Sequence, residues 1–242
     1  PAVAAWTAAA LTIWLSGHVQ SAGPARATGG DVLFEMIGVR KRLGTRVVLD
    51  AAGLTCEAGE LALVLGENGA GKSTLLRIAA GIVEPDAGEV RVGGAALAGG
   101  DVAARAALGY APDTSDAFPE LSVAEVVSLV AAIRRAPLPA PALRRRLGLD
   151  VVWGQRMRTL SFGQVKRTYL LAAMVGEPPL WLLDEPSNGL DPDGVRLAAD
   201  LLREHVAAGG GAVVATNDAG FVAMLGGSRV RLADGRLARP AS

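Results

Sequence analysis

The sequence predicts an α/β domain with a parallel sheet, on the strength of three observations. An apolar run at 61–65 is followed by a glycine-rich loop and then by a helical stretch at 74–80. Two further continuous apolar runs, at 180–183 and 212–215, are typical of strands covered on both faces. An amphipathic helical pattern separates them at 195–208. With 242 residues, the chain can bury a large core and is long enough for one such domain with a helical insertion.

The elements before and after the glycine-rich loop follow from hydrophobic period and turn residues. Strands are expected at 32–42, 47–49, 54–57 and 89–92, the last ending at the turn Gly93-Gly94. A mostly helical insert is expected at about 112–158. Its first helix starts at Ser122, where Glu125 completes a capping-box pattern. Three prolines then break the chain before a second helix at 142–147, which ends at Gly148.

Composition excludes several classes of function. Lys plus Arg and Asp plus Glu both number 24, so the formal net charge is zero and a nucleic-acid partner is not expected. The one dense basic run, 144–146, is interpreted as a solvated helix end. Cys56 is the single cysteine, which excludes an intrachain disulfide and suits a reducing, cytoplasmic setting with the thiol buried. His18 and His205 show no metal-ligand spacing, so both are expected to be structural or exposed.

The first 30 residues form a separate apolar segment and linker. Residues 2–15 carry no charge and include Trp6 and Trp14, but they fall short of the roughly 20 residues that span a bilayer. They also lack the basic leading segment of a secretory signal. Four interpretations stay open: part of a membrane helix, an interfacial helix anchored by the tryptophans, an oligomer contact, or a helix packed on the domain. The linker is rich in Gly, Ala and Pro, so the domain itself is expected at 31–242.

Residues 66–73 read Gly-Glu-Asn-Gly-Ala-Gly-Lys-Ser, which is the pattern G-x-x-x-x-G-K-S between a strand and a helix. Backbone N–H groups of such a loop surround a phosphate, and the helix N-terminus adds positive potential. Lys72 can reach the β- and γ-phosphates, and the Ser73 hydroxyl can ligate magnesium. Nucleotide contacts are therefore expected from Gly66, Glu67, Asn68, Gly69, Ala70, Gly71, Lys72, Ser73 and Thr74. The sequence predicts that the chain binds a nucleoside triphosphate with Mg²⁺.

Two acidic residues end the apolar run at 180–183. Asp184 can hold magnesium through water, and Glu185 can polarise an attacking water. An Asp-Glu pair after a strand is common, and it gains weight here from the phosphate loop 112 residues earlier.

Two more stretches extend the pattern to a known family. Residues 160–164, Leu-Ser-Phe-Gly-Gln, resemble the signature sequence of ABC ATPases, and residues 187–191, Ser-Asn-Gly-Leu-Asp, resemble their D-loop. Together with the Walker A and Walker B motifs just described, they resemble in order and spacing the ATP-binding subunits of ABC transporters over about residues 32–240. The sequence of residues 179–184, Pro-Leu-Trp-Leu-Leu-Asp, is similar to that of the nucleotide-binding domains of bacterial exporter-type systems, including those of the haem-export type.

The resemblance implies a P-loop NTPase core of the RecA-like type with a small antiparallel β subdomain and a helical signature subdomain. It implies two domains that meet head to tail, as a homodimer or heterodimer, with ATP between the phosphate loop of one and the signature of the other. Contacts to the partner's nucleotide are then expected from Ser161, Phe162, Gly163, Gln164 and Asp191. It further implies membrane-spanning partner subunits and a peripheral position on the cytoplasmic face of the membrane.

Three positions depart from the family's pattern. Leu43 stands where an aromatic residue usually stacks on adenine, so base contact is expected to be weaker. Asp113 stands where a glutamine links the nucleotide to the helical insert, and its carboxylate can still reach magnesium or its water. Asn217 stands where a switch histidine orients the catalytic glutamate, which predicts slow hydrolysis with Glu185 and Asn217 as the catalytic pair.

Two hypotheses follow for the function. The first is an ATP-hydrolysing motor subunit of a membrane transporter. The second is a nucleotide-binding partner subunit that hydrolyses poorly and lends its signature to a competent partner. A soluble family member acting on ribosomes or DNA is less favoured, because such proteins generally carry two domains in one chain or long coiled-coil insertions.

Overall fold

The computed structural model describes residues 30–98, 102–113 and 118–239. The segment 1–29, with His18 and the apolar stretch 2–15, lies outside the described residues. The strands are β1 (Val32–Leu43), β2 (Arg46–Glu57), β3 (Leu61–Leu65), β4 (Ala87–Val92), β5 (Ala95–Ala96), β6 (Leu108–Ala111), β7 (Leu180–Asp184), β8 (Gly211–Ala215), β9 (Ser228–Ala233) and β10 (Arg236–Ala238). The helices are α2 (Lys72–Ala79), α3 (Val102–Ala106), α4 (Val123–Arg134), α5 (Pro141–Arg146), α6 (Phe162–Met174), α7 (Pro192–Ala207) and α8 (Ala219–Leu225), with short 3₁₀ turns at Asp150–Val152 and Met157–Thr159.

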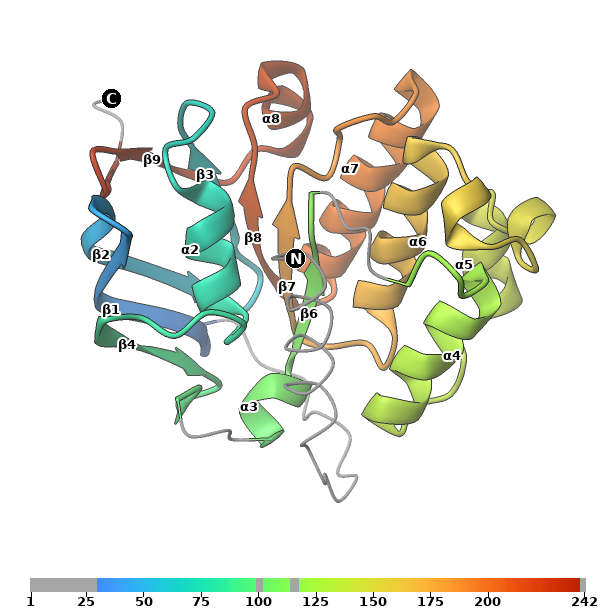
Figure 1. Cartoon of the computed structure of the whole chain (residues 1–242), viewed down its shortest axis with the longest axis horizontal. Helices are drawn as coiled ribbons and strands as arrows, with labels where there is room; N and C mark the ends of the chain where they lie inside the picture. The colour runs from blue at the N-terminus through green and yellow to red at the C-terminus, as the bar shows by residue number, and fades with distance from the viewer. Residues whose placement is uncertain (1–29, 99–101, 114–117, 240–242) are drawn as a thin grey trace.

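A six-stranded sheet with the order β10-β9-β3-β8-β7-β6 forms the centre of the domain (Figure 1). Strands β9, β3, β8, β7 and β6 run parallel, and β10 pairs antiparallel at the edge. Every residue of β7 and β8 is buried. Alternate residues enter two different apolar clusters, since Trp181 and Leu183 pack with α6 and α7 while Leu180 and Leu182 pack on the side of α2. Burial on both faces explains the unbroken apolar runs from which the parallel sheet was predicted.

A four-stranded antiparallel sheet, β2-β1-β4-β5, packs beside this core and confirms the predicted β subdomain. The prediction of two short strands at 47–49 and 54–57 is wrong, because they are one strand, β2. The pairing of β1 with β2 contains several register shifts, and Ala51 has φ 53°. These irregularities break the alternation of apolar residues, which is why the sequence read as two pieces.

The helices between 112 and 158 form a group on the opposite side of the sheet from β1 and β2 (Figure 1). Helix α4 starts at Ser122, whose side chain accepts from the Glu125 N–H, while the Glu125 carboxylate accepts from the Ser122 N–H. This confirms the predicted capping box. Helix α5 begins at Pro141 instead of 142, and proline is favoured at a first helical position because no N–H is needed there.

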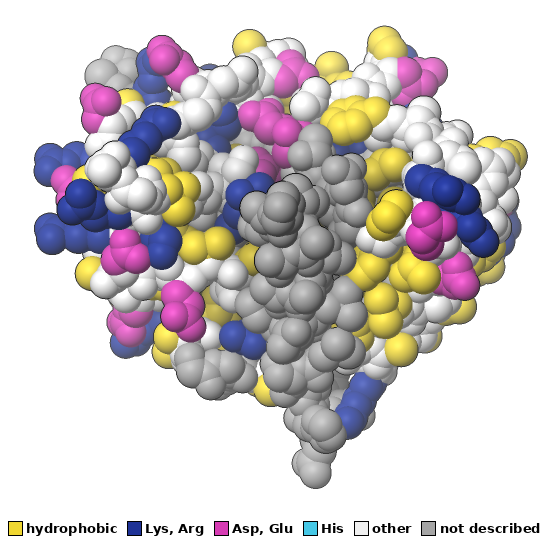
Figure 2. Space-filling view, in the orientation of Figure 1, with side chains coloured by type: hydrophobic (Ala, Val, Ile, Leu, Met, Phe, Trp, Pro, Cys, Tyr) yellow, Lys and Arg dark blue, Asp and Glu magenta, His cyan; other side chains and the backbone are white. Residues whose placement is uncertain are grey.

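Charges on the surface are paired locally. Figure 2 shows Lys and Arg side chains along the edge formed by β1, β2 and β4, with acidic side chains interspersed among them. Lys41 donates to Asp86 over 2.8 Å there. In the basic run of α5, Arg144 pairs with Asp150 and lies over a tryptophan ring, and Arg146 binds both oxygens of Glu204. The run is the last turn of α5 and none of its residues is buried, so the predicted solvated helix end is confirmed, with ion pairs at two of its three arginines.

Two residues that the sequence analysis singled out, Cys56 and His205, lie within the described part of the chain. Cys56 is fully buried, as expected, and burial raises the pKa of its thiol to about 12. His205 stacks on Trp181 with ring centroids 3.9 Å apart, which confirms a structural role.

Among the described helices, none combines the length and the apolar character that crossing a membrane requires.

Candidate nucleotide-binding site

The phosphate loop joins β3 to α2 at the carboxyl edge of the parallel sheet. Gly71 has φ 109°, and a Cβ there would lie 2.6 Å from the Val48 Cγ1 atom of β2. A side chain at this position would collide with the neighbouring sheet, so the loop requires glycine. The predicted strand–loop–helix arrangement is present, and Lys72 is the first residue of α2.

Lys72 points across the loop toward the end of β7. Its side chain is 6% exposed, and Nζ donates to the Gly66 carbonyl over 2.8 Å and to the Glu67 carbonyl over 3.3 Å. The same Nζ lies 3.4 Å from Glu185 Oε1. An ammonium in this position has its three donors directed at oxygen atoms. Phosphate oxygens entering the loop can replace these acceptors with charge-assisted bonds.

Asp184 lies beneath the loop with one carboxylate oxygen left over. The residue is 2% exposed, and burial raises the pKa of its carboxyl, while a hydrogen bond from Ser73 acts in the opposite direction. Among the described residues, none hydrogen-bonds its buried Oδ1 atom. A free carboxylate oxygen beside a serine hydroxyl fits the water-mediated and direct contacts that P-loop proteins make with Mg²⁺. The described residues contain no cluster of three or more His, Cys, Asp or Glu that could hold a metal ion.

Asp113 also lines the pocket, but its carboxylate is already engaged. Oδ1 accepts from Asn188 Nδ2 over 3.1 Å and lies 3.4 Å from Lys166 Nζ. Asn188 belongs to the stretch that follows Glu185, and Lys166 belongs to α6. The Oδ1 atom of the carboxylate predicted to approach magnesium is thus held by two side chains.

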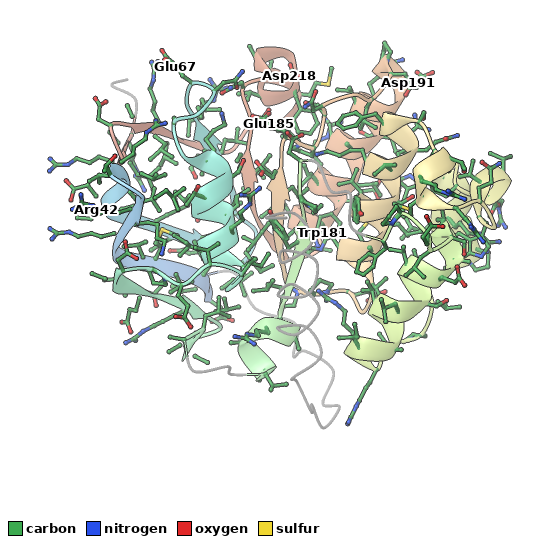
Figure 3. The ribbon with its side chains drawn as sticks, viewed as in Figure 1. Arg42, Glu67, Trp181, Glu185, Asp191 and Asp218 are labelled. Atoms are coloured by element: carbon green, nitrogen blue, oxygen red, sulfur yellow. The ribbon has the colours of Figure 1, made fainter. Side chains whose placement is uncertain are left out.

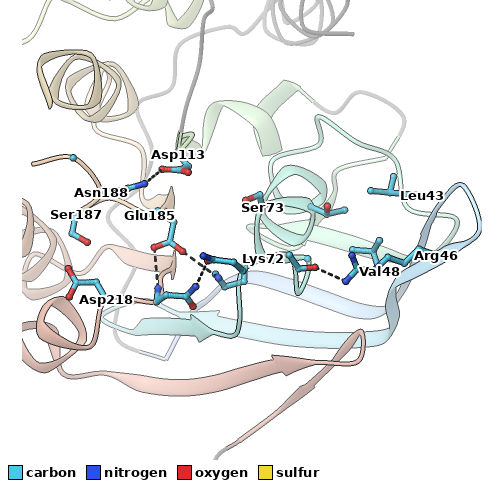
Figure 4. Close-up of a pocket in the computed structure, with 16 residues that line it drawn as sticks. Leu43, Arg46, Val48, Lys72, Ser73, Asp113, Glu185, Ser187, Asn188 and Asp218 are labelled. Atoms are coloured by element: carbon cyan, nitrogen blue, oxygen red, sulfur yellow. Dashed lines mark hydrogen bonds and ion pairs between the residues drawn. The ribbon is translucent and has the colours of Figure 1, made fainter. Parts of the chain in front are cut away.

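Glu185 stands at the end of β7 in a strained backbone conformation. Its φ is 44°, in the left-handed region that non-glycine residues rarely adopt. The Glu185 N–H donates to the Ala215 carbonyl over 2.8 Å, and the carboxylate Oε2 accepts from the Asn217 N–H over 3.1 Å. Strain of this kind persists where surrounding contacts over-determine the geometry, and it is concentrated at functional sites. Here it directs the carboxylate at Lys72 and the phosphate loop (Figure 4).

Asn217 contacts both the catalytic candidate and the phosphate loop. Its backbone N–H, and not its side chain, contacts Glu185. The side-chain Nδ2 donates to Asn68 Oδ1 over 2.6 Å, which joins the loop after β8 to the phosphate loop. The amide group is therefore beside the place where a γ-phosphate would lie, but it is occupied by Asn68.

These residues line an open cleft of about 910 Å³ (Figure 4). Its far end is apolar and basic: Leu43 is 52% exposed there, and Arg46 Nη2 donates to the Gly69 carbonyl over 2.7 Å. Leu43 lies at the end of β1 and Arg46 at the start of β2, so the tight turn between the strands brings both to the pocket.

Most of the predicted pocket residues meet in this cleft. The lining includes Leu43, Asn68, Gly69, Gly71, Lys72, Ser73, Thr74, Asp113, Glu185 and Asn217. It also includes residues that the sequence did not single out as nucleotide contacts: Arg46, Val48, Ser187, Asn188, Gly189 and Asp218. Arg46 follows Leu43 by three residues, and Asp218 directly follows Asn217. Their proximity in sequence to predicted contacts was therefore the signal by which they could have been identified as pocket residues.

The signature residues lie outside the cleft of their own chain. Ser161 and Gln164 form the capping box of α6, and the Phe162 ring covers Gly189, where a Cβ would lie 1.9 Å from its Cδ1 atom. Asp191 caps α7 and pairs with Arg167 of α6. Figure 3 shows Asp191 well to one side of Glu185 and Asp218, which stand above the ends of β7 and β8. Gly163 lies beside Phe162 in the first turn of α6.

Comparison with known proteins gives a consistent result. A family model described as ABC transporter matches residues 49–188. The cytochrome c biogenesis ATP-binding export protein CcmA of Cupriavidus necator is 36% identical over 79% of this chain and 83% of its own length. The Nod factor export ATP-binding protein I of Ralstonia nicotianae is 31% identical over 77% of this chain and 60% of its own. The zinc import ATP-binding protein ZnuC of Paramagnetospirillum magneticum is 36% identical over 72% and 64%.

Solved structures agree with the sequence comparison. An ATP-binding subunit of an ABC transporter superposes with a TM-score of 0.77 at 28% identity, covering 85% of this chain and 88% of that one. A dimeric ATP-binding cassette bound to ADP and Pi has the same fold, with a TM-score of 0.72 at 23% identity over 86% and 97%. With the phosphate loop, the Asp-Glu pair and the predicted two-sheet architecture in place, the chain belongs to the ATP-binding subunits of ABC transporters.

Proposed function

We propose that this chain hydrolyses Mg-ATP slowly and drives export through a membrane-spanning partner, to which it binds on the cytoplasmic face. The observation that carries the proposal is the convergence of Lys72, Glu185 and Asn217 on one cleft, with Asp184 and Ser73 beneath it. A chain that only bound nucleotide would not need a carboxylate placed beside the phosphate-binding lysine.

The residues of this chain divide the chemistry among them. Lys72 exchanges the loop carbonyls for β- and γ-phosphate oxygens and offsets their charge. Glu185 orients the attacking water and accepts its proton, while the Asn217 N–H holds the carboxylate in line. Asn217 offers a short amide where the family has histidine, and that amide is shared with Asn68. The transition state then lacks a full hydrogen bond, which is why hydrolysis is slow.

Ser73 and Asp184 would hold the magnesium, and the observation that fits it is the Asp184 oxygen for which the described part of the chain supplies no hydrogen-bond donor. Held there, the ion would supply positive charge that offsets the negative charge developing on the phosphate oxygens during hydrolysis. The Oδ1 atom of Asp113 would face the ion only if its contacts with Lys166 and Asn188 were exchanged for it.

The signature residues act on the nucleotide of a second domain in this proposal. Ser161, Phe162, Gly163 and Gln164 start α6 at the surface, outside their own cleft, and the Phe162 side chain is 45% exposed. A head-to-tail pair places such a helix start against the γ-phosphate of the partner's ATP. The partner domain can be a second copy or a related chain. Export is the proposed direction because CcmA and the Nod factor protein are both named for export.

Steady-state ATP hydrolysis by the purified chain, alone and with its membrane subunits, tests the proposal. Wild-type protein should release phosphate with a requirement for Mg²⁺, and Lys72→Ala should bind no fluorescent ATP analogue while keeping its far-UV circular dichroism. The substitution removes the buried cation that faces the phosphates. Binding of the analogue without any turnover in the full complex would instead identify a nucleotide-binding subunit that depends on a competent partner. Normal analogue binding by Lys72→Ala would refute the site.

A further inference from the structure

Lys166 of α6 is a buried cation that lies at the junction of three segments. Its side chain is 1% exposed. Nζ donates to the Asp184 carbonyl over 2.7 Å and to the Pro112 and Asp113 carbonyls over 3.0 Å each. The Asp113 carboxylate is 3.4 Å away. One ammonium thus connects the signature helix, the loop after β6 and the end of β7.

Two of the groups that Lys166 holds belong to the magnesium side of the cleft. Asp184 carries the buried oxygen that no described residue hydrogen-bonds, and Asp113 lines the cleft. The 2.7 Å bond to the Asp184 carbonyl fixes the backbone from which that carboxylate extends. Through this one ammonium, α6 is connected both to the Asp184 backbone and to the Asp113 carboxylate.

The charge of Asp113 explains why a cation is needed at this position. Asp113 is partly buried and lies close enough to Asp184 for the two carboxylates to interact, as Glu185 also does, so it adds a third negative group beside the cleft. Like charges this close repel each other strongly unless a counter-charge is present. Lys166 supplies that charge from below the cleft, and Asn188 donates to the same oxygen from the side.

We propose that Lys166 is a positioning residue that sets the geometry of the magnesium side of the nucleotide site and links it to the signature helix. The inference rests on the proposed function, because it concerns the same Mg-ATP site. Without the ammonium, three carbonyls and a carboxylate lose a donor, and buried acceptors left unpaired rearrange. The Asp184 and Asp113 carboxylates then lose their fixed relation to Ser73, while the phosphate loop and Lys72 are left in place.

The test separates nucleotide affinity from its metal dependence. A fluorescent ATP analogue is titrated into the full chain with Mg²⁺ and again with EDTA, and the ratio of the two Kd values gives the preference for the metal complex. Lys166→Met keeps the length of the side chain and removes its charge. We expect the preference to fall by about tenfold, equivalent to about 1.4 kcal/mol, with the EDTA affinity changed by less than about threefold. In ATP hydrolysis, kcat should fall more than KM rises.

Arg134→Met is the matched control. Arg134 of α4 is also a helix cation that donates to backbone carbonyls, those of Val175 after α6 and Leu108 in β6. Leu108 is the first residue of β6, whereas Asp113 follows the other end of that strand. It should lower the melting temperature and leave the metal preference as in wild type. If Lys166→Met does not fold, Lys166→Arg carries the test, because its planar fork cannot reproduce the ammonium geometry. It should show a smaller loss of the same preference.

Two outcomes overturn the inference, and they differ from failure of the proposed function. A soluble Lys166→Met or Lys166→Arg protein with the metal preference of wild type shows that Lys166 is structural only. An equal loss of preference in Arg134→Met shows a general effect of instability. Wild-type protein that does not bind the analogue with Mg²⁺ or EDTA contradicts the proposed function itself.

Discussion

Replacing Asn217 with histidine should raise the rate of ATP hydrolysis. The backbone N–H that holds Glu185 is kept in the variant, since it does not depend on the side chain. The substitution removes the side-chain amide that donates to Asn68 in the wild-type protein. The imidazole that takes its place can direct an N–H donor at the γ-phosphate.

The expected gain follows from these contacts. One transition-state donor is worth on the order of 10²–10³ in rate, or about 2.7–4 kcal/mol. Loss of the Asn68–Asn217 hydrogen bond offsets about 1 kcal/mol of this. The remainder is at least about 1.4 kcal/mol, or a tenfold faster kcat, with little change in nucleotide affinity.

Phosphate release by the full transporter complex measures the effect, with Asn217→Ala as the control. Alanine frees Asn68 and supplies no donor, so it should not accelerate the reaction. A histidine variant no faster than wild type would refute the assignment of Asn217 as the missing donor. An alanine variant as fast as the histidine variant would assign the gain to release of Asn68 instead.

Three other predictions concern different parts of the chain. Glu185→Gln should bind ATP but not turn it over, and should form an ATP-dependent complex with its partner domain in size-exclusion chromatography; failure with every partner would contradict the head-to-tail model. Burial lowers the pKa of His205 in the folded state, so the unfolded state binds more protons as the pH falls below the ordinary histidine value of about 6.5. The contribution of His205 to the free energy of unfolding should therefore be constant above that pH and fall by up to about 1.4 kcal/mol per pH unit as the pH drops toward the folded-state pKa. Urea unfolding measures this, and His205→Phe, which keeps a ring on Trp181, should flatten the response. Deleting residues 1–30 should reduce liposome association with little change in ATP binding, and a large drop in melting temperature would show that the segment belongs to the core.

The sequence predicted the parts of the fold that depend on local patterns. The strands β3, β7 and β8 were predicted because burial on both faces leaves an unbroken apolar run. Strand β6 was not predicted, because it has only four residues and its pairing with β7 comes from a segment far away in sequence. Strand β9 was also missed, because its buried and exposed residues alternate and leave no unbroken apolar run. Strand β10, with three residues, and helix α8, with seven, are too short to show a clear period.

The site was predictable where chemistry is contained in one stretch of chain. The phosphate loop and the Asp-Glu pair were recognised from residue types and order alone. Lys166 was not singled out from the sequence, because its acceptors come from the loop after β6 and from the end of β7, both more than fifteen residues away. The bond between Asn217 and Asn68 spans 149 residues and depends on the neighbouring ends of β3 and β8.

The positive φ of Glu185 has a consequence for how variants of this protein would be selected. A left-handed conformation at a non-glycine residue costs on the order of 1–3 kcal/mol, and glycine adopts it without that cost. Glu185→Gly would therefore relieve backbone strain while removing the carboxylate beside Lys72. A screen for heat resistance alone would enrich such inactive proteins, so thermostable libraries of this chain need ATP turnover as a second criterion.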